Sequence, residues 1–130
     1  MVEKVVIDGD KGIQRMFGRL LESNLRDDLT EIMDDAAGLL QEEMKARAPV
    51  RTGNLRDNII KEDPEVKPDE ITLNVGPNKQ AFYARFIELG TSKAPPHPFM
   101  RQAAKSKQAA VNERVATGIR NLIDREARKQ

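Results

Sequence analysis

A stripe of apolar side chains between Leu29 and Ala48 constrains the fold of this chain more than any other feature of its sequence. The apolar residues recur every three or four positions, which is the spacing of one face of an α-helix. The stripe consists of Leu29, Ile32, Met33, Ala36, Leu40, Met44 and Ala48. Asp27 or Asp28 is placed to cap the start of this helix, and Pro49 ends it because proline has no backbone N–H for a helix interior. A helix of this kind must bury its apolar face against other elements.

The residues before this helix predict a strand and a further helix. Residues 2–8 form a short segment that is rich in β-branched side chains, and it leads into the turn signal Asp8-Gly9-Asp10. Four apolar residues at helical spacing then follow in residues 11–24: Ile13, Phe17, Leu20 and Leu21. We therefore expect a strand over residues 2–8 and helices over residues 11–48.

Residues 58–90 are expected to form antiparallel strands. Residues 54–59 are expected to begin as a single helical turn, with Leu55 and Ile59 four positions apart, and residues 59–62 then predict a strand. After a polar connection that contains two prolines, residues 71–75 alternate apolar and polar side chains. This alternation is typical of a half-buried strand, and Gly76-Pro77 ends it.

Residues 82–89 have apolar side chains on both parities and stop at Gly90-Thr91. A strand with this pattern is covered on both faces. We expect a strand here, with one face against a helix of the same chain and the other against a neighbouring subunit.

A last helix is expected over residues 99–129, after a stiff connector that contains Pro95, Pro96 and Pro98. At 1.5 Å per residue such a helix is more than ~40 Å long, which exceeds the core of a domain of this size. We therefore expect it to bend near Gly118 or to dock its end elsewhere. Together the patterns predict one α+β domain over residues 1–130, with a small antiparallel sheet of three to four strands packed against long N-terminal and C-terminal helices.

The composition excludes several kinds of chemistry. The 130 residues contain no Cys and one His, so disulfides, thiolate metal sites, cysteine nucleophiles and multi-histidine metal sites are ruled out. We find no phosphate-binding glycine loop, dinucleotide fingerprint or serine-hydrolase motif, and we expect no catalytic residues, no cofactor and no metal. No apolar run approaches the ~18 residues of a membrane span, and the N-terminus shows no signal peptide, so we expect a soluble protein made inside the cell.

Charge is distributed unevenly along the chain. Residues 1–46 hold 11 acidic and 6 basic side chains, whereas residues 101–130 hold 3 acidic and 8 basic ones. The two regions can pair within one molecule or between copies. A second hypothesis is a nucleic-acid-binding module that uses the basic last helix, although the aromatic residues that would stack on bases are few. Its basic residues are Arg101, Lys105, Lys107, Arg114, Arg120, Arg125, Arg128 and Lys129.

Three segments together resemble one family. Residues 46–55 (ARAPVRTGNL) resemble its A-x-A-P-V-x-T-G-x-L segment, and residues 83–91 (YARFIELGT) resemble its Y-A-x-F-x-E-x-G-T segment. Residues 96–103 (PHPFMRQA) resemble its x-x-P-F-M-x-x-A segment. The family is that of the tail-completion, or head–tail joining, proteins of long-tailed bacteriophages and prophages, the gene-product-ten-like minor tail proteins. The order and spacing of the segments agree, with Leu89 and Arg51 as minor departures.

The resemblance implies a structural protein of the virion tail or neck and not an enzyme. Such proteins are made in the cytoplasm of the host bacterium and are thought to form a ring, often of six copies. The implied partners are further copies of the chain, the tail tube protein and the head connector protein. The DNA would pass through the lumen of such a ring, and no membrane is involved.

The residues expected to form the interface or to fix its shape lie in the turns between the sheet and the helices. Glu88 lies among apolar residues and needs a cation, because a buried carboxylate without a partner is costly. Arg51, Arg85 and Arg101 are the candidates, within a subunit or across the ring. The full set is Pro49, Arg51, Thr52, Gly53, Leu55, Tyr83, Phe86, Glu88, Gly90, Thr91, Pro98 and Phe99.

Overall fold

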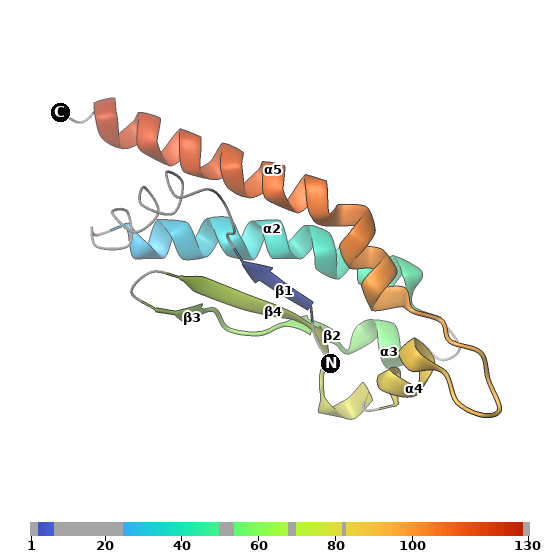
Figure 1. Ribbon diagram of the computed structural model, residues 1–130. Helices are drawn as coiled ribbons and strands as arrows, with labels where there is room; N and C mark the ends of the chain where they lie inside the picture. Colours follow the sequence, from blue (N-terminus) through green and yellow to red (C-terminus); the bar gives the residue numbers. More distant parts are fainter. Residues whose placement is uncertain (1–2, 7–24, 50–53, 68–69, 82, 129–130) are drawn as a thin grey trace.

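The computed structural model describes residues 3–6, 25–49, 54–67, 70–81 and 83–128. An antiparallel sheet packs against two long helices, α2 (Arg26–Arg47) and α5 (Phe99–Arg128), as Figure 1 shows. This confirms the predicted α+β architecture. The helix expected over residues 11–24 lies outside the described residues.

The apolar stripe of α2 is its buried face. Its buried residues are Leu29, Met33, Ala36, Ala37, Leu40 and Met44. Ala48 has an extended backbone with ψ of 135°, because the residue before a proline is pushed away from helical geometry. The predicted cap was wrong: Leu25 is the N-cap and makes no side-chain hydrogen bond, while Asp27 and Asp28 lie within the first turn. Their negative charges still favour the positive end of the helix dipole.

Strand β4 (Ile71–Pro77) is the centre of the sheet. It pairs on one side with β1 (Glu3–Val6), where Val5 lies opposite Leu73. On its other side it pairs with β2 (Ile59–Lys61) and then with β3 (Glu65–Val66). Two short strands thus share one edge of β4, so the sheet is three strands wide. Strand β3 falls in the segment that was expected to be a polar connection.

The alternation along β4 sets which face is buried. Ile71, Leu73 and Val75 are fully buried, while Thr72 and Asn74 are half-buried on the opposite face. Helix α2 covers β4 and β2, and α5 packs along α2 and reaches β1. The predicted helical turn before β2 is confirmed as α3 (Asn54–Asp57), and a 3-10 turn, η1 (Lys79–Ala81), follows β4.

The strand predicted over residues 82–89 is wrong. Residues Ala84–Leu89 form a short helix, α4, with Ala84 and Glu88 buried and Phe86 and Leu89 exposed. Residues four apart share one face of a helix, and here that buried face holds Ala84 and Glu88. A second, exposed face holds Phe86 and Leu89, so apolar residues fall at both even and odd positions of the sequence, as they would in a strand covered on both sides. The two patterns are indistinguishable over so few residues.

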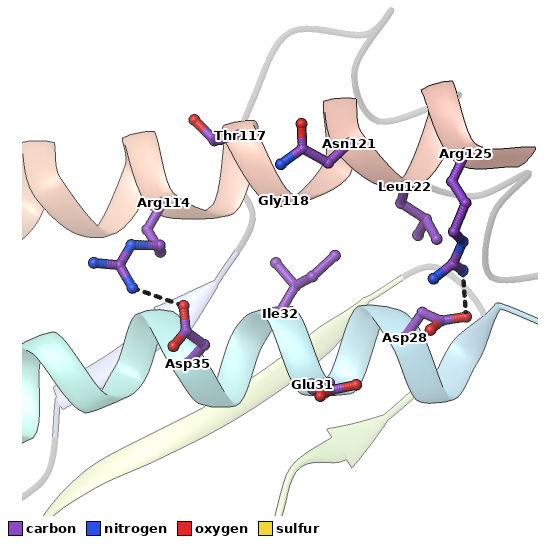
Figure 2. Close-up of a pocket in the computed structure, with 10 residues that line it drawn as sticks. All are labelled: Asp28, Glu31, Ile32, Asp35, Arg114, Thr117, Gly118, Asn121, Leu122 and Arg125. Atoms are coloured by element: carbon purple, nitrogen blue, oxygen red, sulfur yellow. Dashed lines mark hydrogen bonds and ion pairs between the residues drawn. The ribbon is translucent and has the colours of Figure 1, made fainter.

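Helix α5 is anchored at its start and lies along α2 for the rest of its length. Phe99 and Met100, at its first turn, are buried in the core. Figure 1 shows that α5 changes direction in its first turns, and Figure 2 shows no bend at Gly118. Gly118 is instead a point of close approach, because a Cβ there would lie 2.8 Å from Ile32 Cγ2. Docking on α2 therefore accommodates the length of this helix.

Candidate functional site

The Glu88 carboxylate joins α4 to the start of α5. Glu88 is only 1% exposed, and its Oε2 accepts a hydrogen bond from the Met100 backbone N–H at 3.0 Å. Its Oε1 accepts one from the Arg101 backbone N–H at 3.1 Å. The first N–H groups of a helix have no partner within the helix, and a carboxylate at this end also interacts favourably with the helix dipole. Glu88 therefore caps α5 from a distant part of the sequence.

The cation expected for Glu88 is Arg101 of the same chain. Arg101 Nε lies 3.2 Å from Glu88 Oε1, while the Arg101 side chain remains 63% exposed. Arg85, another candidate, places its guanidinium 5.5 Å from the centre of the Phe86 ring. Arg51 lies outside the described residues. Because Arg101 is largely in water, most of the stabilisation of Glu88 comes from the two backbone N–H groups.

The connector between α4 and α5 is held at its beginning by Gly90. Its φ of +78° is in the left-handed region, and a Cβ there would meet Pro96 N at 2.8 Å. Thr91 Oγ1 then accepts hydrogen bonds from the backbone N–H groups of Lys93 and Ala94. These contacts fix a tight turn at which only glycine fits the first position.

His97 fastens the end of this connector to two helices. Its backbone N–H donates to the Ile87 carbonyl of α4 at 2.8 Å. Its Nε2 lies 3.1 Å from the Arg47 carbonyl at the end of α2, which is hydrogen-bonded when Nε2 carries the proton. The sequence indicated a surface or interface histidine. In the structure it is exposed, and its contacts join the connector to α4 and to the end of α2.

A set of amide side chains holds α4 against α3 and the end of β4. Asn54 Nδ2 donates to the Tyr83 hydroxyl at 2.8 Å, and Asn58 Nδ2 donates to the Asn54 carbonyl at 2.7 Å. Asn78 Nδ2 in turn donates to Asn58 Oδ1 at 2.8 Å. Of these four residues, only Tyr83 was singled out from the sequence. The result is that both ends of α4 are fixed by hydrogen bonds.

Helix α4 presents an apolar face to solvent from this fixed position. Phe86 is 48% exposed and Leu89 is 57% exposed, more than any other large apolar side chain among the described residues. They are three positions apart, so they share one side of the helix. We refer to Phe86 and Leu89 as the α4 face. Large exposed apolar groups on a rigid support are typical of protein–protein contacts.

Most of the predicted site residues lie at α4, in the connector that follows it, or at the start of α5. Leu55 and Phe99 are buried in the core, and Pro98 is half-buried at the start of α5. Pro49 is exposed just after α2. The remaining predicted residues between Pro49 and Leu55, namely Arg51, Thr52 and Gly53, lie outside the described residues.

The acidic and basic regions of the sequence meet inside one molecule. Arg114 Nη1 of α5 lies 2.8 Å from Asp35 Oδ2 of α2, and Arg125 Nη2 lies 3.1 Å from Asp28 Oδ2. The hydrogen bond that Asp28 accepts raises the pKa of Arg125 above its usual value. Lys107 also lies 4.0 Å from Glu43. These pairs reduce the positive charge that α5 offers to a phosphate backbone, which weakens the nucleic-acid hypothesis.

Residues 3–6, 25–49, 54–67, 70–81 and 83–128 contain neither a metal-binding cluster nor a membrane-spanning helix. Within them, no cluster of three or more His, Asp or Glu side chains is arranged to hold a metal ion. No helix within the same ranges has the length and apolar character to cross a membrane.

Comparison with known proteins matches the chain to a family. The sequence model of the family described as "Bacteriophage HK97-gp10, putative tail-component" matches residues 11–90, which is more than half of the chain. Searches of curated proteins and of solved structures gave no match. The matched range includes α2, β4 and α4, and it ends at Gly90.

Proposed function

We propose, from the premise that this chain belongs to the HK97 gp10-like family of bacteriophage tail components, that it completes the tail and joins it to the head connector as a ring of identical copies. Family membership supports a role as a component of the phage tail. The ring and the joining step are our proposal. The role is structural, and no step of it requires a bond to be made or broken.

The observation that carries the proposal is the α4 face. Its two apolar side chains stand in solvent although the helix beneath them is fixed by Glu88, Gly90 and the Tyr83 hydroxyl. A loop that served only to connect two elements would not need this support. A docking surface does, because ordering a flexible segment on binding reduces the affinity.

A ring further requires two different contact surfaces on each copy. In a cyclic assembly each copy binds the next one through a heterologous contact, whereas a symmetric dimer uses one surface twice. The chain is suited to this arrangement because α4 lies at one end of the α2–α5 pair, which leaves the opposite end of the pair for a different contact (Figure 1).

The proposal is tested with phage particles that lack this chain. We expect electron microscopy to show DNA-filled heads and separate full-length tails, because both parts assemble but do not join. Purified chain added to such heads and tails should restore joined, infectious particles. The Leu89→Asp chain is the matched control, and we expect it to fold and to restore few particles.

Two results would contradict this function. Joined particles at the normal yield without the chain would exclude a joining role. Absence of the chain from normal tails would exclude a tail component of the finished particle.

A further inference from the structure

A groove runs between the first half of α2 and the second half of α5 (Figure 2). In Figure 1 this part of the helix pair lies away from α4. Its volume is about 490 Å³, which is the size of a typical binding cleft. Two ion pairs bound it along its length, Arg114–Asp35 and Arg125–Asp28. The function proposed above does not by itself assign a role to this groove.

The floor of the groove is apolar and its shape depends on Gly118. Ile32 of α2 packs directly against Gly118, which has no side chain to fill the space between the helices. Leu122, one turn further along α5, is buried beside it. The floor therefore offers apolar surface between two charged ends.

The rim of the groove carries excess negative charge. Asp28, Glu31 and Asp35 line it from α2, opposite two arginines from α5. Each arginine is paired with an aspartate, so Glu31 is left as the surplus charge at the rim. An adjoining hollow shares Glu31 and adds Glu42. A partner that enters the groove should thus combine apolar side chains with positive charge.

The α4 face has this combination. Phe86 and Leu89 supply the apolar side chains, and Arg85 lies over the Phe86 ring. Lys93 is exposed in the connector that follows α4, four positions after Leu89. Glu88 is the acidic residue of α4. It is buried against the start of α5, so its negative charge does not reach this surface.

We propose that the α4 face of one copy docks into the α2–α5 groove of the next copy. The two surfaces lie at opposite ends of the helix pair, so one chain cannot close the contact with itself (Figure 1). Two different surfaces that fit each other generate a ring or a filament and not a symmetric dimer. This inference rests on the proposed ring and specifies which surfaces build it.

Cross-linking between engineered cysteines tests the contact, because the natural chain contains none. The variant carries Leu89→Cys in the α4 face and Asn121→Cys at the groove. Tails that contain it are treated with a short bis-maleimide and run on a denaturing gel. We expect a ladder of covalently joined multiples, because each copy is linked to two neighbours. Leu89→Cys alone and Asn121→Cys alone should stay at the size of one chain.

The outcomes separate this inference from the function on which it rests. Tails that contain the double variant but give no ladder would overturn the inference and leave the tail role intact. Linked dimers from Leu89→Cys alone would also overturn it, because they indicate a symmetric contact. Absence of the natural chain from tails would overturn both proposals.

Exchange of charges gives a second, independent test. Arg85→Glu with Lys93→Glu reverses the charges beside the α4 face. Glu31→Lys with Glu42→Lys reverses the surplus charge of the groove rim and of the adjoining hollow. We expect each variant alone to lower the yield of joined particles at least tenfold. A mixture of the two should recover much of it, because each reversed surface then finds an opposite charge on the other variant. No recovery from two folded variants would contradict the proposed pairing.

Discussion

The two ends of α5 are held in different ways. At its start, Phe99, Met100 and the Glu88 carboxylate are buried, and Glu88 accepts hydrogen bonds from the backbone N–H groups of Met100 and Arg101. From its middle onward α5 packs on α2 through buried apolar residues such as Leu122, and its polar contacts there are exposed ion pairs. In the Arg114–Asp35 pair the two side chains are 48% and 59% exposed. The polar contacts of one helix are thus buried at its start and exposed along the rest of its length.

The difference indicates what each end can do. A hydrogen bond to a charged group contributes about 1.5–3 kcal/mol, whereas an exposed ion pair contributes about 0–1 kcal/mol. The start of α5 can present the α4 face without further ordering. Toward the other end, a partner in the groove can replace the exposed ion pairs while Leu122 stays packed in the core. The predictions that follow test this contrast, from the largest expected effect to the smallest.

Glu88→Ala should give the largest loss of stability, at the start of α5. It leaves the Met100 and Arg101 N–H groups without their acceptor and removes a buried side chain. We expect the free energy of unfolding to fall by about 3 kcal/mol, measured by denaturant unfolding.

The control for this variant is Glu42→Ala, an exposed glutamate of α2. It should change the free energy of unfolding by no more than about 0.5 kcal/mol. Glu88→Gln keeps one acceptor oxygen and should lie between the two. Equal, small effects from Glu88→Ala and Glu42→Ala would contradict the capping role of Glu88.

Gly90→Ala should have the next largest effect. Alanine is strained at φ of +78°, and its Cβ would meet the Pro96 backbone nitrogen. We expect a loss of about 2 kcal/mol in the free energy of unfolding. Gly38→Ala in α2 is a suitable control, because the nearest atom to its added Cβ is Lys61 Nζ at 3.9 Å. That variant should be neutral or more stable, since alanine favours a helix. Equal stability of the two variants would argue against a strained turn.

Arg114→Ala should have the smallest effect of the three. The Arg114–Asp35 pair is exposed, so we expect the free energy of unfolding to fall by only about 0.5 kcal/mol. The loss should shrink further as salt is added, because salt screens exposed charges. A loss as large as that of Glu88→Ala would remove the distinction between the two ends.

Much of the fold follows from periodic patterns in the sequence. The apolar stripe from Leu29 and the alternation from Ile71 each continue long enough to identify one element, and both predictions are confirmed. Helix α4 was misassigned as a strand because six residues span fewer than two helical turns. Strand β3 has two residues and depends on β4 for its pairing, so nothing local predicts it.

The candidate site also contains features that the sequence predicts and features that it does not. The need of Glu88 for a cation follows from the cost of a buried charge, and the structure confirms Arg101 among the three candidates. Its two backbone partners were not foreseen, because they exist only once α5 begins at Phe99. The groove was missed altogether. It arises where Gly118 meets Ile32, residues far apart in the sequence, and the only local signal was a glycine inside a helix.

The most direct test of this account replaces Phe86 and Leu89 together by Ser. Both side chains are exposed, so the free energy of unfolding should stay within about 1 kcal/mol of the natural chain. Phage that carries this variant should nevertheless produce filled heads and separate tails, counted by electron microscopy. Joined, infectious particles at the natural yield would contradict the claim that the α4 face exists for docking.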